Sequence, residues 1–460
     1  MNDFLFQPGS RIHLVGIGGT GMSAIARVML QQGYLISGSD RSASPFTEAL
    51  SAMGATVYIG HDAAHIHGAQ ALIATSAAND QNPEIAAAKA KGLPIFRRSE
   101  MIGALLRGRR VIAAAGTHGK TTTTGMIAHI LREAQRDPGF IIGSVLKSAG
   151  TNAELGRGAD FVIEADEYDY MFLGLEPAAA VVTSVEWDHP DFFPTAEAFT
   201  EAFDRFAGRI LPGGVLIACA DDAGANALAH RREMNGGRVV RYGTAAGVDV
   251  RLTDVTDRGD ETRFSLHFPQ EGMIEVRLPL TGLHNALNAA AAITAARWHG
   301  VDLRTAAAAL AGFSGTGRRF EVRADRGGIA VIDDYAHHPT AIRVTLAGAR
   351  ARYPDRAIWA VWQPHTFSRT QALIEGYATA FGAADHVIVT PIYAAREQPS
   401  AGIDGAWAAG RIAEHHRDVV AVNSLSEAAG LLRERVRPPA AIVIFSAGDA
   451  PQIGLEYLRI

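Results

Sequence analysis

The chain has 460 residues, of which 48% are hydrophobic and 20% charged, a composition typical of a folded globular protein. At about 150 residues per domain, this length predicts about three domains. The formal net charge is −5, from 43 Lys and Arg against 48 Asp and Glu, and no basic stripe appears, which argues against a general nucleic-acid-binding protein. The single cysteine, Cys219, excludes an intramolecular disulfide framework and a cysteine-rich zinc module.

The sequence shows neither a targeting signal nor a membrane helix. Its first residues lack a charged region followed by an apolar run and a small-residue cleavage site. No stretch reaches the ~18 uninterrupted apolar residues that a membrane helix needs. We therefore expect a cytoplasmic protein without a membrane or nucleic-acid partner, and Cys219, which lies in an apolar run, is expected to be a small buried hydrophobe. The oligomeric state stays open.

Short apolar runs alternate with amphipathic stretches along the chain, which is the pattern of repeated strand–helix–strand units. Residues 11–16 predict a buried strand and residues 21–32 the helix that follows it, with a shorter strand at residues 34–37. A basic connector at residues 107–110 leads into a new strand at residues 111–115. We place the first domain boundary at this connector.

The same pattern restarts twice more, at the strand after the basic connector and again near the GTGRRF segment that begins at Gly315. A charged, β-rich stretch at residues 248–280 interrupts the second unit. The predicted fold class is α/β with three domains in series. They are an N-terminal Rossmann-like domain, a central P-loop ATPase-like domain with a mixed sheet, and a C-terminal Rossmann-like domain, over residues 1–107, 108–314 and 315–460.

The first motif with chemical meaning is a G-x-G-x-x-G turn between the first strand and its helix. It contains Gly16, Gly18, Gly19 and Gly21. Such glycines let the backbone approach a diphosphate, whose charge the helix N-terminus favours. Asp40 follows at the end of the next strand, where an acidic side chain can meet a ribose hydroxyl. The alternative is a tight strand–helix turn without a ligand.

The second motif, GTHGKTTTT, follows a strand and begins a helix, as a phosphate-binding loop should. Lys120 would neutralise phosphate charge and the Thr121 hydroxyl would reach Mg²⁺. The loop is a variant, because Ala114 stands where a full Walker A motif has its first glycine. The residues expected to bind ATP in this loop are Gly116, Thr117, His118, Gly119, Lys120, Thr121 and Thr122.

Two acidic clusters follow the next two apolar runs, at the strand ends where open α/β sheets bind their ligands. The first contains Glu164, Asp166, Glu167 and Asp169, and the second contains Glu186, Asp188, His189 and Asp191. Carboxylates beside a phosphate loop are typical of a Mg²⁺ site. For any single acid, the alternative is a solvated surface charge or a helix cap.

The third unit carries the segments GTGRRF, DDYAHHP and QPHTFSR. Their arginines have the side chain best suited to bidentate recognition of phosphate or carboxylate. His337 and His338 are adjacent, and neighbouring side chains of an extended segment point in opposite directions. That pair alone therefore does not predict a metal site, and hydrogen bonding near a substrate carboxylate is the favoured interpretation.

In this order, the glycine-rich turn, GTHGKTTT, EADEYD, E-x-DH, GLHNALN, GTGRRF and DDYAHHPT resemble the Mur ligases of peptidoglycan synthesis. The resemblance spans essentially the whole chain. It implies that the N-terminal domain holds a UDP substrate, the central domain ATP and the C-terminal domain an amino acid. It further implies that ATP converts the muramate carboxylate of the substrate into an acyl phosphate, which the amino group attacks to form an amide.

The resemblance also assigns residues. It implies Mg²⁺ (or Mn²⁺) at Thr121, Glu164 and His189, and further ATP contacts from His284, Asn285, Asn288 and Arg319. It implies UDP-substrate binding by the glycine-rich turn and Asp40. His338, His365 and Arg369 resemble the group around the acyl phosphate and the amino acid. The expected catalytic residues are Lys120, Glu164, His189, Arg319, Asp334 and His338.

Family motifs leave the acceptor open between L-alanine and a recycled murein tripeptide. Tyr168 stands where the members that add L-alanine have Ser, which brings EADEYD closer to the tripeptide-adding members. Trp187, Pro190 and Thr366 also depart from the L-alanine pattern, although QPHTFSRT as a whole favours it. We favour L-alanine as the acceptor and UDP-N-acetylmuramate as the co-substrate.

Two rival interpretations belong to other classes. An NAD-dependent dehydrogenase would explain the glycine-rich turn and Asp40, but it leaves GTHGKTT and the acidic clusters unexplained. A non-catalytic nucleotide-sugar sensor would keep the fold, and the presence of Lys120, Glu164 and His189 argues against it.

Overall fold

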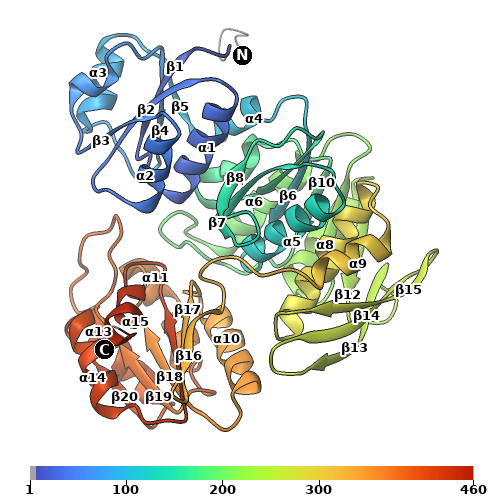
Figure 1. Cartoon of the computed structure of the whole chain (residues 1–460), viewed down its shortest axis with the longest axis vertical. Helices are drawn as coiled ribbons and strands as arrows, with labels where there is room; N and C mark the ends of the chain where they lie inside the picture. The colour runs from blue at the N-terminus through green and yellow to red at the C-terminus, as the bar shows by residue number, and fades with distance from the viewer. Residues whose placement is uncertain (1–6, 459–460) are drawn as a thin grey trace.

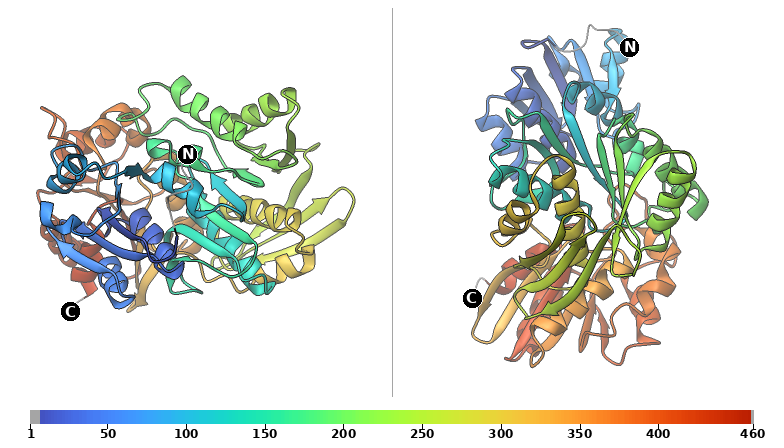
Figure 2. Two further views of the ribbon diagram at one scale, coloured as in Figure 1. Left: turned by 90° about the horizontal axis from the view of Figure 1, so that it is seen from above. Right: turned by 90° about the vertical axis from the view of Figure 1, so that its right-hand side faces the viewer.

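The computed structural model of the protein describes residues 7–458, and within this range the strands form three sheets, one in each third of the chain. Figure 1 shows the N-terminal part at the top, the C-terminal part at the bottom and the central part in contact with both, an order that Figure 2 shows again from the side. Residues 1–6, part of the segment considered for a targeting signal, lie outside the described residues. Among the described helices, none is both long and apolar enough to span a membrane.

The N-terminal sheet is parallel, with strand order β3-β2-β1-β4-β5. The chain passes from one side of β1 to the other, so the loop after β1 lies at the switch point where open α/β sheets bind ligands. Strands β1 and β4 are almost fully buried, because helices cover both faces of a parallel sheet. The elements are β1 (Arg11–Val15), α1 (Thr20–Gln31), β2 (Leu35–Asp40), α2 (Pro45–Ala52), β3 (Thr56–Ile59), η1 (Ala63–Ile66), β4 (Ala71–Ala74), α3 (Pro83–Ala90), β5 (Ile95–Arg97) and α4 (Arg98–Leu105).

The central sheet has ten strands in the order β15-β14-β13-β12-β11-β10-β6-β9-β7-β8. Strands β12 to β7 of this order run parallel, whereas β14, β15 and β8 pair antiparallel, so the sheet is mixed as predicted. The elements are β6 (Arg110–Ala115), α5 (Lys120–Glu133), β7 (Gly139–Leu146), β8 (Thr151–Glu154), β9 (Asp160–Glu164), η2 (Tyr168–Gly174), β10 (Ala179–Val182), α6 (Ala196–Gly208), β11 (Val215–Cys219), α7 (Ala223–Met234), β12 (Arg238–Gly243), β13 (Val250–Asp257), β14 (Thr262–Phe268), β15 (Gly272–Leu278), α8 (Leu283–Trp298) and α9 (Leu303–Leu310).

The C-terminal sheet has six strands in the order β16-β17-β21-β18-β19-β20, all parallel except the edge strand β16. The elements are β16 (Glu321–Arg326), β17 (Ile329–Asp334), α10 (Pro339–Arg352), β18 (Ala357–Trp362), α11 (Phe367–Ala372), α12 (Ile374–Ala378), β19 (His386–Val389), α13 (Gly405–Ala413), β20 (Val419–Ala421), α14 (Leu425–Arg435), β21 (Ala440–Phe445) and α15 (Pro451–Leu458). The predicted α/β fold with three domains in series is confirmed, while the proposed domain limits stay a prediction.

In the N-terminal sheet, three strands differ from the predicted elements. The strand predicted at residues 34–37 extends to Asp40, and the sequence analysis does not predict β3 or β5. Both are short strands whose side chains are partly exposed, so they lack the continuous apolar run that marks a buried strand. Cys219 is buried at the end of β11, as expected.

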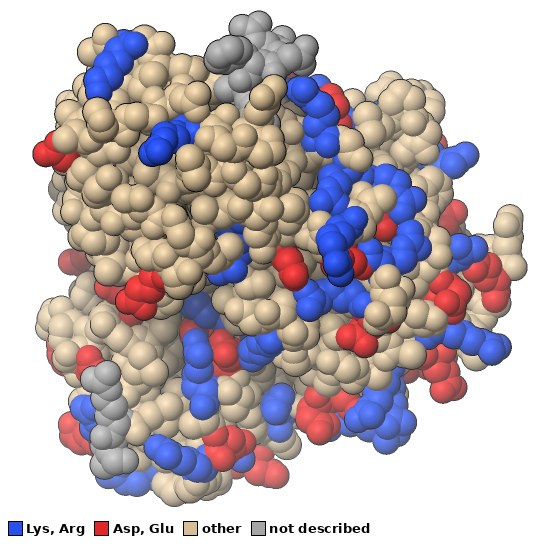
Figure 3. Space-filling view, turned by 45° about the horizontal axis from the view of Figure 1, so that its top comes forward, with Lys and Arg blue, Asp and Glu red and all other residues tan. Residues whose placement is uncertain are grey.

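One hydrophobic core runs through both the N-terminal and the central parts, whereas the C-terminal sheet has two clusters of its own, one on each face. Helix α1 packs against β7 and β8, and the Asn152 side chain donates a hydrogen bond to the carbonyl of Thr20 at 3.1 Å. The C-terminal part meets the central part through the polar contacts described below. On the face drawn in Figure 3, acidic and basic side chains are interspersed rather than gathered by sign.

Candidate functional site

The glycine-rich turn after β1 is held by the end of β2. Gly16 has φ +80, a left-handed conformation that favours glycine. The carbonyl of Ser39 accepts hydrogen bonds from the N–H groups of Gly16 (2.8 Å) and Ile17 (3.0 Å). Asp40 Oδ2 accepts the Gly18 N–H at 2.8 Å. The carboxylate of Asp40 therefore accepts a hydrogen bond from the turn itself. Its predicted contact with a ribose hydroxyl stays a prediction.

Behind this turn lies a fully buried carboxylate that the sequence analysis did not single out. Glu84, in the first turn of α3, accepts a hydrogen bond from the Ser39 hydroxyl at 2.6 Å. His65 Nδ1 lies 2.8 Å and His61 Nδ1 3.1 Å from the same carboxylate, and His13 Nε2 lies at 3.7 Å. Glu84 thus anchors the residue whose carbonyl holds the glycine-rich turn.

The phosphate loop joins β6 to α5 as predicted, and Gly119 adopts φ +78 at the helix N-cap. A Cβ atom at Gly119 would lie 2.5 Å from Asn288 Oδ1, so only glycine fits between the loop and α8. Lys120 Nζ donates to the carbonyl of Gly116 at 2.6 Å and to Glu167 Oε1 at 2.9 Å. Burial alone would lower the pKa of Lys120, but Glu167 and the other nearby carboxylates raise it above its usual value.

The expected metal-binding residues Thr121, Glu164 and His189 line the cavity beside the phosphate loop. Thr121 Oγ1 donates to Glu164 Oε1 at 3.0 Å, and the Gly143 N–H donates to Glu164 Oε2 at 2.6 Å. Burial raises the pKa of Glu164, while Arg319 and Lys120 act in the opposite direction. Thr121 and Glu164 are therefore adjacent, as their expected role requires.

Glu167 is a functional candidate that the sequence analysis named in a cluster but did not select. Its Oε1 atom lies 2.9 Å from Lys120 Nζ and 3.6 Å from His189 Nε2, which links the phosphate loop to the second acidic cluster. Its Oε2 atom is buried and has no hydrogen-bond partner. A buried carboxylate oxygen without a partner is costly unless a ligand satisfies it. The oxygen-rich donor set of Thr121, Glu164 and Glu167 fits a hard cation such as Mg²⁺.

Two residues of the C-terminal part, Arg319 and Asp334, line the cavity beside Thr121 and Glu164. Arg319 Nη2 donates to Thr121 Oγ1 at 2.9 Å, and its guanidinium carbon lies 5.1 Å from the centre of the Tyr335 ring. Asp334 accepts the N–H groups of Phe320 and Ala336, both at 2.7 Å, and so fixes the turn that carries Arg319. Burial raises the pKa of Asp334.

His284, Asn285 and Asn288, which are expected to contact ATP, lie at the start of α8. Asn285 Nδ2 donates to the carbonyl of Thr281 at 2.8 Å, and Asn288 lies against Gly119. Burial lowers the pKa of His284 to about 4, so this imidazole is neutral near pH 7. All three residues line the cavity beside the phosphate loop.

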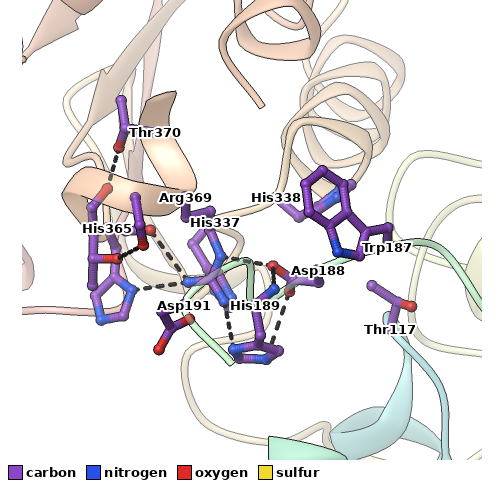
Figure 4. A network of polar contacts seen from close by, with 12 residues as sticks. Thr117, Trp187, Asp188, His189, Asp191, His337, His338, His365, Arg369 and Thr370 are labelled. Atoms are coloured by element: carbon purple, nitrogen blue, oxygen red, sulfur yellow. Dashed lines mark hydrogen bonds and ion pairs between the residues drawn. The ribbon is translucent and has the colours of Figure 1, made fainter. Parts of the chain in front are cut away.

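Arg369 is the centre of a buried network that joins the central and C-terminal parts (Figure 4). Its Nε donates to Asp188 Oδ1 at 2.7 Å, and its Nη2 lies 3.0 Å from His189 Nδ1. Nη1 of Arg369 lies 3.0 Å from His365 Nδ1. Burial and the neighbouring Arg369 lower the pKa of His365 to about 3, so His365 is a neutral acceptor of this hydrogen bond. The structure therefore places His189, an expected Mg²⁺ ligand, directly against Arg369 and close to His365, the group expected around the amino acid.

The adjacent histidines face different partners, as Figure 4 shows. The ring of His337 lies 5.8 Å from that of His365, in the Arg369 network. His338 instead caps α10, where its Nδ1 accepts the Thr340 N–H at 3.3 Å. The structure thus separates the two histidines and places His337 in the Arg369 network. The only sequence signal for it was its place beside His338.

His338 belongs to a second interdomain group, with His118 and Glu186, whose donor atoms lie within 4.8 Å of one another. His118 Nε2 lies 2.7 Å from Glu186 Oε2, and the Thr340 hydroxyl donates to Glu186 Oε1 at 2.8 Å. Burial alone would raise the pKa of Glu186, but the nearby histidines and Thr340 lower it to about 2. Two imidazoles and a carboxylate suit zinc better than magnesium.

Members of these groups, among them His118, Lys120, Glu164, His338 and Arg369, line one cavity of about 740 Å³. The N-terminal part contributes Thr20, Gly21 and Arg98, the central part contributes the phosphate loop, and the C-terminal part contributes the Arg369 network. Such a shared cavity can hold two substrates and exclude water from the region between them.

Family models match three stretches of the chain. The model "Mur ligase family, catalytic domain" covers residues 11–110, "Mur ligase middle domain" covers 114–296 and "Mur ligase, glutamate ligase domain" covers 318–448. A UDP-N-acetylmuramate–L-alanine ligase from Mycolicibacterium vanbaalenii is 44% identical, over 97% of this chain and 95% of its own length. The chain belongs to the Mur ligase family. The Mur ligase identity inferred from the motifs is thus confirmed.

Further similarities cover nearly the whole of this Mur ligase. A UDP-N-acetylmuramate–L-alanine ligase from a Roseiflexus species is 42% identical, over 96% of this chain and 97% of its own. The crystal structure of a UDP-N-acetylmuramate–alanine ligase from Thermotoga maritima superposes with a TM-score of 0.83 at 28% identity, over 97% of this chain and 98% of that one. A murein peptide ligase from Psychrobacter arcticus gives a TM-score of 0.75 at 28% identity, with 98% of both chains covered.

A first prediction concerns the phosphate loop. Gly119→Ala should raise the KM for ATP by at least about tenfold, because its Cβ collides with Asn288 and left-handed backbone disfavours alanine. Steady-state kinetics over a range of ATP concentrations would measure this. Gly430→Ala in α14 is the matched control, since nothing lies within 4 Å of its added Cβ. An unchanged KM in Gly119→Ala would contradict the assignment.

A second prediction concerns acid stability. Burial alone would raise the pKa of Glu84, but its histidine and Ser39 contacts lower it to about 2. Because the folded pKa is below the unfolded value of about 4.3, the ionised carboxylate stabilises the fold above that value and loses this effect as pH falls toward 2. Thermal unfolding from about pH 6 to 3 should show wild type losing stability more steeply than Glu84→Gln. Glu48→Gln, in α2, should behave like wild type, and parallel curves for wild type and Glu84→Gln would refute the assignment.

Proposed function

We propose that this Mur ligase uses ATP to join L-alanine to UDP-N-acetylmuramate through an acyl phosphate, in peptidoglycan biosynthesis. The observation that carries the proposal is the shared cavity, in which a phosphate loop and an arginine–histidine group face each other across carboxylates. Full-length relatives named for this activity support the choice of acceptor and co-substrate. The partners are thus small molecules, and the reaction is proposed to take place in the cytoplasm.

At the ATP end, the loop residues Gly116 to Thr122 surround the phosphates and Lys120 neutralises their charge. His284, Asn285 and Asn288 lie on the adenosine side, and Arg319 and Asp334 complete the site from the C-terminal domain. Thr121, Glu164 and His189 are the proposed Mg²⁺ ligands, and Mn²⁺ would suit the same donors. When bound, such a cation screens the charge of the phosphate oxygens.

At the UDP end, Gly16, Gly18, Gly19 and Gly21 bring the backbone close to the diphosphate, as the N-terminus of α1 favours. Asp40 and Glu84 contribute by holding this turn in place. Thr20 and Gly21 border the shared cavity, which lets the muramate carboxylate extend toward the phosphate loop.

The negative charges of the two reactants explain why the proposed reaction needs cationic side chains. A carboxylate oxygen attacks the γ-phosphorus of ATP and ADP leaves, which brings two anions together and requires the cationic groups Lys120 and Arg319. The amine of L-alanine, once deprotonated, then attacks the acyl carbon, and the tetrahedral intermediate expels inorganic phosphate to leave an amide. His338, His365 and Arg369 are proposed to bind the acyl phosphate and the amino acid. The cavity excludes water, which would otherwise hydrolyse the acyl phosphate.

A murein tripeptide is the second candidate acceptor. It is favoured by Tyr168 in EADEYD and by the similarity to the murein peptide ligase from Psychrobacter arcticus. A non-catalytic nucleotide-sugar sensor is a third candidate from another class, and it would release no phosphate with any acceptor.

A third prediction tests the phosphate loop in turnover. Phosphate release should require UDP-N-acetylmuramate, Mg²⁺ and the acceptor together, and Lys120→Ala should reduce kcat by at least about 10²-fold because it removes a charge that stabilises the transition state. Lys89→Ala, whose exposed side chain pairs with Asp80, is the control. Turnover by Lys120→Ala at the wild-type rate would refute the assignment.

A fourth prediction identifies the acceptor. With phosphate release as the readout, L-alanine should give a higher kcat/KM than glycine, L-serine or the murein tripeptide. The amide product should be verified by mass spectrometry. A preference for the tripeptide would replace L-alanine with the second candidate, and no release with any acceptor would favour the sensor.

A further inference from the structure

Tyr168, one of the residues that depart from the L-alanine pattern, lies in the lining of the shared cavity. It follows β9 at the start of η2, and its ring lies 5.0 Å from that of His189 and 5.1 Å from that of Phe192. Its hydroxyl donates to Asp191 Oδ2 at 3.1 Å. The ring is thereby fixed beside the Arg369 network.

Arg396 reaches this ring from the C-terminal domain. It belongs to the segment between β19 and α13, and its guanidinium carbon lies 4.2 Å from the centre of the Tyr168 ring. The same guanidinium forms an ion pair with Asp191. Tyr168, Asp191 and Arg396, here called the acceptor clasp, therefore connect the central domain to the C-terminal domain.

The segment that carries Arg396 is anchored to the turn that carries His365 and Arg369. Glu397 accepts a hydrogen bond from Thr366 Oγ1 at 2.5 Å and from the Ser368 N–H at 2.9 Å. The ring of Tyr393 stacks on His365 at 5.8 Å. Thr366, which also departs from the L-alanine pattern, thus helps to hold the clasp over the proposed amino-acid site.

The clasp residues line the same cavity as His365 and Arg369, and the Arg396 side chain is 39% exposed whereas that of Asp191 is 17% exposed. A free amino acid can lie behind them. For a peptide acceptor that extends past these side chains, the second residue would separate the ion pair and the cation–π contact.

We propose that the acceptor clasp closes the amino-acid end of the cavity and restricts the acceptor to a single amino acid, a specificity role that rests on the proposed ligase function. The restriction rests on Arg396 and its contacts with Asp191 and the Tyr168 ring, and not on the tyrosine by itself. Tyr168, Asp191 and Arg396 are positioning residues here, since they act on access to the site.

The test compares wild type, Arg396→Ala, Tyr168→Phe and Arg411→Ala with L-alanine and with the murein tripeptide. Arg396→Ala should raise the ratio of tripeptide to L-alanine kcat/KM by about tenfold, since it removes both an ion pair and a cation–π contact. Tyr168→Phe keeps the ring face and should keep most of the selectivity. Arg411→Ala is the matched control. It removes an arginine of α13 that pairs with Glu375 on α12 and with Glu414.

Hydrogen exchange supplies a readout independent of turnover. Residues 390–404 should exchange faster in Arg396→Ala than in wild type, with no change in Arg411→Ala. An unchanged selectivity ratio, unchanged exchange in Arg396→Ala, or a wild-type preference for the tripeptide would each overturn the clasp. Failure of the wild type to release phosphate with either acceptor would instead contradict the ligase function itself.

Discussion

The structure depends above all on how charge is balanced around Lys120. This lysine is held between the loop carbonyls and Glu167, with Glu164 and Asp166 close by and Arg319 bonded to the neighbouring Thr121. A buried cation among carboxylates is stable only while the charges compensate one another. The cavity is thereby suited to receive anionic phosphates together with a cation, since their opposite charges leave the balance around Lys120 unchanged.

The same principle organises the acceptor end. Arg369 is almost completely buried and is balanced by Asp188, while the neighbouring His365 is kept neutral by that cation and by desolvation. Each of the two strongly charged centres therefore combines residues from loops of the central sheet with an arginine of the C-terminal domain, Arg319 in the first and Arg369 in the second. Neither centre is complete within a single domain.

The sequence predicts local features well. The glycine-rich turn, the phosphate loop at Gly119 and Lys120, and the acids at the ends of β9 and β10 all follow from motifs that one strand–loop–helix unit determines. Short edge strands such as β3 are not predicted, because they lack a buried apolar run. The roles of Glu84, Glu167 and His337 could not be inferred either, since each depends on partners that only the folded chain brings near.

The way in which the domains are joined has a consequence for solution conditions. The N-terminal and central domains share one hydrophobic core, whereas Arg319, Thr340, Arg369 and Arg396 attach the C-terminal domain through hydrogen bonds and ion pairs. Salt screens exposed charges at separations beyond about 8 Å at physiological ionic strength, but it scarcely weakens hydrophobic contact. The joint to the C-terminal domain should therefore respond to ionic strength mainly at its exposed ion pair, Arg396 with Asp191, and far less at the buried pair of Arg369 with Asp188.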